Sequence, residues 1–337
     1  MGLALAITVD VEEEGLFCGK YPRVPPGVRN VQELSRLEFI PQEFGFPITF
    51  MVTYAVARDK GACRILRSWC ERYKAEIGAH LHHWNTPPFI NLPGQRPGDA
   101  ASASTLPWQE KLISLLRAIR EGLGVFPRSF RMGRFEVNST IISLLRQHGL
   151  VVDSSKVPLR QVVGGPDQFL TPPDPHWLHP PNSPEGPLLE VPLTVVAWST
   201  RISALTYRLS RLMPDRQGEL WRRGFSYVGT AGPQPTMYPL FSMCHGVRLH
   251  RRRGGEVITM YLHSSELLPG GSPQFPDELA VQGLVRKIRK FLTWLVQTNA
   301  VTGVTLAELY AKRAGDQQGA VCSGDSLRQN SKFGLEI

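Results

Sequence analysis

Residues 3–14, LALAITVDVEEE, pass from an apolar run straight into acidic side chains. The apolar part is rich in aliphatic residues and far shorter than a membrane-crossing helix, which is typical of a buried β-strand. We therefore expect an interior strand whose carboxyl end carries Asp10 and Glu12. The fold class then depends on the segments that follow this strand.

Strand and helix patterns alternate through the rest of the chain. Strands are expected within 47–57, 75–80, 129–133, 150–155, 188–196 and 256–265, and helices within 31–44, 59–72, 106–124, 138–149, 201–213 and 276–299. This alternation predicts an α/β fold with a parallel sheet, open or closed into a barrel. Two stretches rich in Pro and Gly, 156–187 and 224–239, are expected to be loops.

One domain accounts for the pattern, since neither an internal repeat nor a second boundary is evident. We assign residues 1–314 to this domain. From about Gly315 the periodicity and the apolar content are lost, so residues 315–337 are expected to form a flexible C-terminal tail.

The chain is basic, with 38 Lys and Arg against 29 Asp and Glu and a net charge of +9. Much of the excess lies between Arg208 and Arg253. Zinc-finger, RNA-recognition and basic-zipper patterns do not accompany it, so we expect no nucleic-acid partner. Anionic glycans, nucleotide-linked sugars, a membrane surface or plain solvation of a basic face all fit this charge.

Five cysteines, Cys18, Cys63, Cys70, Cys244 and Cys322, share no paired C-x-x-C spacing. Their odd number argues against a disulfide framework and favours a reducing compartment. The N-terminus lacks the basic flank and cleavage signature of a signal peptide, and apolar runs long enough to span a membrane are missing. These features predict a cytoplasmic protein without an integral membrane segment.

Polar side chains follow the predicted strands where each one ends. They are Asp10 and Glu12, then His80 and His82, then Arg131, and finally His263. Catalytic groups of parallel α/β folds gather at the carboxyl ends of strands, so we expect these residues in one crevice. Taken singly, each has a plain reading as a structural hydrogen-bonding or solvated side chain.

Spacing gives this group a chemistry. Residues two apart in an extended segment share a face, so Asp10 pairs with Glu12 and His80 with His82, whereas His83 points away unless the chain turns. Two imidazoles and one carboxylate suit a catalytic zinc or a similar divalent metal. The other carboxylate could then act as a general base on the attacking water.

Further residues nearby have two open readings. Arg131 could keep the base ionised by pairing with it, or could be a surface arginine like Arg134. Trp84 and Phe89 could stack on a substrate or simply pack in the core or a lid.

Four segments in order, TVDVEEE, EIGAHLHHW, FRMGRF and MYLHSSE, resemble the motifs of the polysaccharide deacetylase family, also called NodB-homology or carbohydrate esterase family four. The similarity covers about 270 residues. Within this family, the segment HLHHWNTPP is most similar to the branch associated with lipopolysaccharide biosynthesis. The resemblance implies a single-domain distorted (β/α) barrel and a hydrolase that cuts carbon–nitrogen bonds other than peptide bonds.

The resemblance also implies roles for individual residues. Asp10 takes the position of the general base and His263 that of the general acid, with Arg131 paired to the base. Glu12, His80 and His82 are the implied ligands of a divalent metal, expected to be zinc. The substrate would be an N-acetylated amino sugar, held in part by Trp84 and Arg134.

Two departures from the family pattern leave alternatives open. The usual adjacent acids are separated here by Val11, so that Asp10 could be the ligand instead of Glu12. The usual second histidine falls on Trp84, and His82 or His83 must replace it. A degenerate or metal-free relative that cuts another C–N amide, or a non-catalytic glycan-binding module, would also fit.

Overall fold

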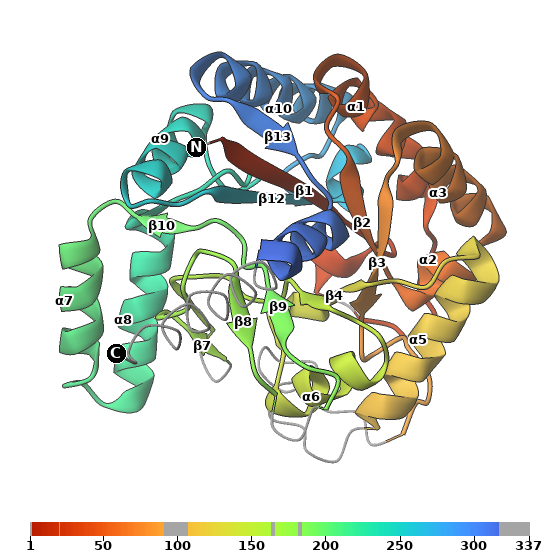
Figure 1. The fold of residues 1–337 in the computed structure, drawn as a ribbon, viewed down its shortest axis with the longest axis horizontal. Helices are drawn as coiled ribbons and strands as arrows, with labels where there is room; N and C mark the ends of the chain where they lie inside the picture. The colour runs from red at the N-terminus through yellow and green to blue at the C-terminus, as the bar shows by residue number, and fades with distance from the viewer. Residues whose placement is uncertain (1, 20, 91–106, 163–165, 181–183, 317–337) are drawn as a thin grey trace, which may run out of the picture.

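The computed structural model describes residues 2–19, 21–90, 107–162, 166–180 and 184–316. Its centre is one curled sheet with strand order β12-β1-β2-β3-β4-β5-β9-β8, and helices form an outer ring around it (Figure 1). The strands are β1 Leu3–Val11, β2 Ile48–Val52, β3 Glu76–Leu81, β4 Ser129–Met132, β5 Val152–Asp153, β8 His176–Leu178, β9 Leu188–Glu190 and β12 Val257–His263. β13, Val301–Gly303, pairs with the start of β1.

Neighbouring strands of this sheet run parallel except β8, which lies antiparallel to β9. The chain after β9 returns to the opposite edge, where the Thr194 amide donates to the Thr259 carbonyl of β12 over 3.2 Å. The sheet therefore curls most of the way round, and the predicted α/β barrel is confirmed.

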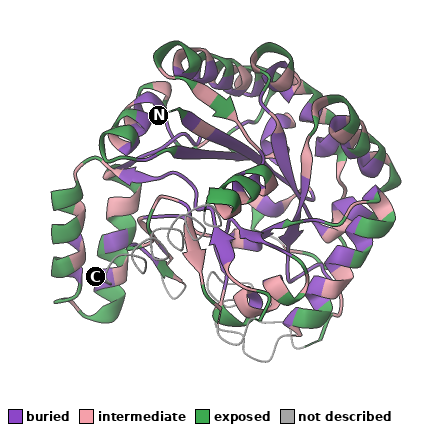
Figure 2. Cartoon of the chain, in the orientation of Figure 1, coloured by how far each residue is buried: buried purple, intermediate pink, exposed green. Residues whose placement is uncertain are grey.

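Helices cover the outside of the sheet. They are α1 Phe39–Phe44, α2 Tyr54–Arg58, α3 Lys60–Tyr73, α5 Trp108–Leu123, α6 Ser139–Gln147, α7 Thr200–Ser210, α8 Asp215–Val228, α9 Leu240–Arg252 and α10 Glu278–Thr298, and a further helix spans 306–316. Figure 2 shows that the central strands are almost wholly buried while the outer faces of these helices are exposed. The apolar faces of α1, α2, α3, α5, α6, α9 and α10 pack in one core between helices and sheet, whereas α7 and α8 contribute no residue to it.

Shorter elements complete the description. Two small antiparallel pairs lie outside the main sheet, β6 Arg160–Gln161 with β7 Asp167–Gln168, and β10 Val196–Ala197 with β11 Thr230–Ala231. The 3₁₀ turns are η1 Leu16–Cys18, η2 Arg29–Leu37, η3 Gly133–Phe135 and η4 Ser264–Leu267.

Several predicted elements need correction. The strand expected within 47–57 ends at Val52, because Thr53 begins the short helix α2. Helices α8 and α9 were not predicted, and α8 includes part of the expected loop 224–239. The helix over 306–316 includes the first two residues of the expected tail, and the rest of that tail lies outside the described residues.

No helix among the described residues is long and apolar enough to cross a membrane. Cys18, Cys63, Cys70 and Cys244 are free thiols.

Candidate metal centre and active site

Strand register brings the predicted residues to one edge of the sheet. Asp10 of β1 lies opposite His263 of β12, and His80 of β3 lies opposite Arg131 of β4. β2 separates the two pairs, and the curl of the sheet turns them toward each other. Glu12 and His82 follow directly after β1 and β3, so they join the same crevice.

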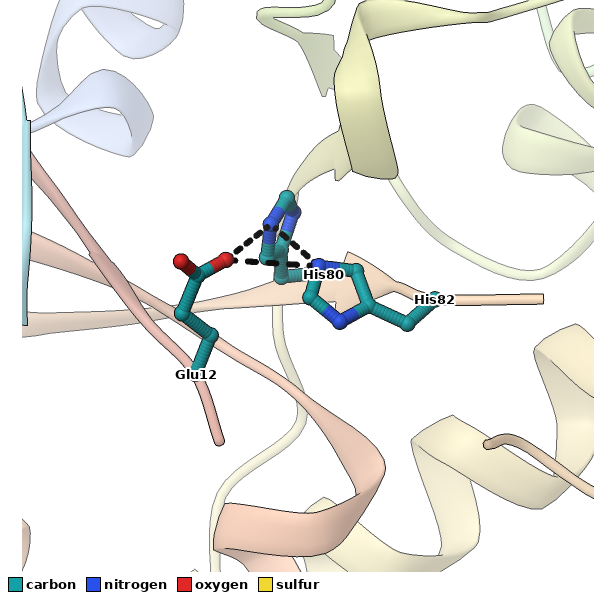
Figure 3. Close-up of side chains that lie close together, drawn as sticks. All are labelled: Glu12, His80 and His82. Carbon is teal, nitrogen blue, oxygen red and sulfur yellow. Dashed lines mark hydrogen bonds and ion pairs between the residues drawn. The ribbon is translucent and has the colours of Figure 1, made fainter. Parts of the chain in front are cut away.

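Glu12, His80 and His82 converge on one point (Figure 3). A carboxylate oxygen of Glu12 lies 3.4 Å from Nε2 of His82 and 3.7 Å from Nε2 of His80. The two Nε2 atoms are 3.0 Å apart, and all three side chains are buried. Within the described residues this is the group of ligand-type side chains that could hold a metal ion.

The outer nitrogen of each imidazole fixes which nitrogen faces the centre. Nδ1 of His80 donates to the Arg131 carbonyl at 3.0 Å, and Nδ1 of His82 donates to the Glu13 carboxylate at 2.8 Å. Both Nε2 atoms therefore present lone pairs inward, and two lone pairs 3.0 Å apart repel unless a proton or a cation lies between them. This donor arrangement fits a divalent metal.

Charges within the centre are strongly coupled. Burial alone would lower the pKa of His82, but the negative charges of Glu13 and Glu12 raise that pKa to about 9. Burial alone would raise the pKa of Glu12, but the charge of His263 and hydrogen bonding to the two imidazoles hold that pKa well below its usual range. Without metal, a proton on His82 occupies the position between the imidazoles, and metal binding must displace it.

Asp10 is held apart from this group by Arg131. One guanidinium nitrogen of Arg131 donates to Asp10 Oδ1 at 2.5 Å, and the others donate to Ser154 and to Thr8 Oγ1. Arg131 is fully buried, so the attraction between its charge and the Asp10 carboxylate is screened little by solvent. The second Asp10 oxygen lies 3.7 Å from Nε2 of His80, at the border of the metal centre.

His263 lies on the other side of the crevice. Its Nδ1 is 3.3 Å from the carboxylate of Glu266, and its ring packs edge-on against Phe17 and Tyr261. Burial alone would lower the pKa of His263, but the charges of Glu266, Glu12 and Asp10 raise that pKa to about 10. His263 is consequently protonated at neutral pH.

Glu13 is a functional residue that the sequence reasoning missed. Of the three consecutive glutamates, Glu14 pairs with exposed Arg29, and Glu12 and Glu13 are buried. Glu13 is buried and accepts hydrogen bonds from His82, from Trp84 Nε1 at 3.2 Å and from Asn85 Nδ2 at 2.5 Å. In the sequence, the hydrogen-bond donors Trp84 and Asn85 directly after the histidines indicate a buried acceptor nearby.

Lys111 is the second residue that was missed. Although it sits on the apolar face of α5, its Nζ donates to the backbone carbonyls of His83, Thr86 and Pro88 at 2.9, 2.5 and 2.6 Å. Burial lowers the pKa of Lys111 to about 8. The sequence sign of this role is a lysine on the apolar face of the helix 108–123. Its hydrogen bonds hold the loop that follows His82.

The remaining candidates lie around the crevice. Trp84 stacks on the His82 ring with centroids 4.3 Å apart, and the Arg134 guanidinium lies 4.5 Å from the centre of the Tyr21 ring. His83 turns away and packs against Trp84 and Trp108, and burial lowers its pKa to about 3. Phe89 is 38% exposed and lies outside the crevice.

A cavity of about 130 Å³ opens above these groups. It is lined by Asp10, Glu12, His80, His82 and His263, with Leu16, Phe17, Tyr21, Trp84, Arg134 and Phe135 around them.

Comparison with known proteins supports the fold. The chain superposes on a proposed polysaccharide deacetylase from Mycobacterium smegmatis with a TM-score of 0.55 and 18% identity, over 94% of this chain and 92% of that one. The Xyl-CE4 domain of a multidomain xylanase from the hindgut metagenome of Trinervitermes trinervoides matches with a TM-score of 0.43 and 12% identity, over 93% and 92%. A 4-alpha-glucanotransferase from Thermococcus litoralis matches with a TM-score of 0.49 and 11% identity, over 92% of this chain and 40% of that one. No family model and no curated protein sequence matches the chain. The similarity to the Mycobacterium smegmatis protein shows that both have the same fold.

Proposed function

We propose that this chain is a metal-dependent hydrolase that removes the N-acetyl group from an amino sugar of a glycan or a sugar precursor. The observation that carries this proposal is the convergence of Glu12, His80 and His82 beside an arginine-bound Asp10. One side of the crevice thus offers metal ligands and the other offers a general base. An acetamide is small enough for the cavity that these groups line.

The donor set of two imidazoles and one carboxylate is the set that zinc takes in several hydrolases, so we propose zinc as the metal. Glu12, His80 and His82 would hold it. When bound, it would supply Lewis-acid stabilisation of the negative charge that develops on the acetamide oxygen.

Asp10 is proposed as the general base. Arg131 occupies its Oδ1, which leaves Oδ2 directed toward the centre to take a proton from the attacking water. The hydrogen bond from Arg131 fixes the Asp10 carboxylate in place, so that its free oxygen can accept that proton.

His263 is proposed as the general acid. Its pKa of about 10 means that it carries a proton before the reaction begins. Donation of this proton to the departing nitrogen would release the amine. Glu266 orients the ring from its Nδ1 side and compensates its charge.

Trp84 and Arg134 are proposed to contact the sugar at the cavity rim. Trp84 is almost fully buried, so its larger contribution is the stacking that holds His82. Arg134 presents a cation beside the Tyr21 ring, where a sugar hydroxyl or an anionic substituent could bind.

A role in surface polysaccharide or lipopolysaccharide biosynthesis in the cytoplasm is the biological setting that we propose. It rests on the resemblance of HLHHWNTPP to that branch, on the absence of cysteine pairing and on the basic charge.

The direct test is release of acetate from a panel of N-acetylated amino sugars by zinc-reconstituted protein. We expect release by the wild type and very little by Asp10→Asn. If the wild type binds a sugar of the panel and metal but releases no acetate from any member, the chain is a binding module and the hydrolase proposal is wrong.

A further inference from the structure

The helical hairpin α7–α8 stands beside the barrel (Figure 1), and much of it is exposed (Figure 2). On α7 the exposed residues include Ile202, Leu205 and Leu209, with exposed fractions of 58%, 55% and 39%. At 100° per residue these three fall within about 60° of the helix circumference. They form one continuous apolar stripe, which we call the α7 stripe.

The inside of the hairpin combines polar and aromatic side chains, and Tyr207 of α7 and Phe225 of α8 pack against buried Phe169. Thr206, Ser210, Gly218 and Arg222 are buried between the helices or against the barrel. Arg222 donates to Ser210 Oγ at 2.9 Å and to Gln161 at 3.0 Å. A surface helix normally turns its aliphatic stripe to the core, so the exposure of the α7 stripe favours a contact on the outside.

Positive charge flanks the α7 stripe. Arg201, Arg208 and Arg211 are exposed and form no ion pair with any other described residue. The segment 200–212 contains no acidic residue. By helical position, Arg201 and Arg208 lie on one side of the stripe, about 40° and about 60° from its Leu205 edge.

The groove beside α7 and the helix α8 also carry basic and aromatic side chains. A groove of about 460 Å³ beside the start of α7 is lined by Trp198, Arg201 and, from the end of α9, Arg252. Helix α8 exposes Trp221 and Tyr227, with Arg216 and Arg223 also exposed and Asp215 as an exposed acid. Aromatic and basic side chains around an apolar stripe are typical of helices that lie in a membrane interface.

We propose that the α7–α8 hairpin docks on the surface of an anionic membrane, with the α7 stripe inserted at the headgroup boundary and the arginines on the lipid phosphates. A second copy of the chain fits less well, because two-fold pairing of the stripes would bring the flanking arginines together. This contact would lie at the membrane surface without spanning the bilayer. The contact goes beyond the proposed hydrolase and does not depend on it.

Co-sedimentation with vesicles tests the proposal. Wild-type protein is mixed with vesicles of phosphatidylcholine alone or with phosphatidylglycerol added, at low and high salt. We expect binding to the anionic vesicles that weakens with salt, and little binding to the neutral ones.

Two sets of variants assign the contact to α7. Ile202→Gln/Leu205→Gln/Leu209→Gln keeps good helix formers and should weaken vesicle binding at least tenfold. Arg201→Gln/Arg208→Gln should weaken it roughly fivefold for each arginine removed. Matched controls on α10, Leu279→Gln/Val296→Gln and Arg286→Gln/Lys290→Gln, remove exposed apolar and basic side chains elsewhere and should bind like the wild type.

Circular dichroism checks that each variant is folded, and acetate release from a soluble sugar should be unchanged in all of them. The proposal is overturned by the absence of wild-type binding, or by equal losses in the α7 and α10 variants. It is also overturned if the α7 stripe variant abolishes self-association of a protein that does not bind vesicles, since the stripe then meets a second copy.

Discussion

Two groups of buried carboxylates lie at the same edge of the sheet and have opposite electrostatics. At the end of β1, Glu12 is surrounded by imidazoles that hold its pKa below the usual range. At the ends of β5 and β9, Asp153 lies opposite Glu190 in register, and both are buried. Burial raises the pKa of both, and the charge of Asp153 raises the pKa of Glu190 further.

The difference comes from the neighbours of each carboxylate. Asp10 has the buried Arg131, and Glu12 has His80, His82 and the charged His263. Asp153 bonds to Ser155 Oγ, and Glu190 accepts from the Lys156 amide at 3.2 Å. A neutral hydroxyl or amide stabilises an anion far less than a buried cation does. The carboxylates at the end of β1 therefore have cationic partners, whereas Asp153 and Glu190 share a proton.

Replacing one carboxylate of each group by an amide should lower turnover strongly in the first group and very little in the second. Asp10→Asn removes the proposed base and should lower kcat by roughly two to four orders of magnitude. Asp153→Asn alters a carboxyl outside the metal centre, paired with Glu190, and should change kcat by no more than a few-fold. Steady-state acetate release on both proteins checks this, and comparable losses would show that the two groups do not differ in function.

The adjacent residues Glu13 and Glu14 allow a similar comparison of metal affinity. Glu13→Gln weakens the acceptor that orients His82 and should lower metal affinity by about 10–100-fold. Glu14→Gln removes only the pair with exposed Arg29 and should leave the affinity intact. Titration against a competing chelator measures both constants. Equal affinities in the two variants would remove Glu13 from the site.

Metal affinity should depend on pH in a direction that the centre dictates. His82, with a pKa of about 9 in the metal-free protein, must lose a proton before it can bind a cation. Apparent affinity should therefore rise with pH, by up to about tenfold per unit below pH 9. Chelator competition at pH 6, 7 and 8, with free-metal levels corrected for hydroxide, gives the slope. A flat profile would contradict protonation of His82.

The pair at β5 and β9 should affect stability instead. The folded-state pKa of Glu190 is raised above its unfolded value, so the folded protein keeps a proton that the unfolded chain releases. Its stability should fall as pH rises above about 4.5, through the window up to the raised pKa. Glu190→Gln keeps an acceptor for the Lys156 amide, removes this slope and should make the folded protein more stable than the wild type at pH 8. Urea unfolding at pH 5 and pH 8 measures it, and parallel slopes for wild type and variant would exclude the shared proton.

The sequence predicted the alternating fold and the residues at the ends of β1, β3, β4 and β12. It could not separate these residues from Asp153 and Glu190, which also follow apolar strands. The distinction depends on partners that come from distant segments, such as Arg131 for Asp10. Glu13 and Lys111 were missed for the same reason, because both act through contacts that local spacing does not determine.

Gly133 illustrates how close those distant contacts are. A Cβ at this position would lie 2.6 Å from the His82 ring and 2.9 Å from the Leu81 carbonyl. The FRMGRF segment thus shapes the metal centre through the absence of a side chain.

The central claim is that Glu12 binds the metal while Asp10 stays outside its ligand set. Metal content of Asp10→Asn and Glu12→Gln, measured by elemental analysis after zinc reconstitution and desalting, tests it most directly. We predict that Asp10→Asn keeps about as much zinc as the wild type, because Glu12, His80 and His82 are intact. Glu12→Gln should lose most of its zinc and recover part of it in excess metal. Loss of zinc from Asp10→Asn together with its retention by Glu12→Gln would contradict the account and exchange the roles of the two carboxylates.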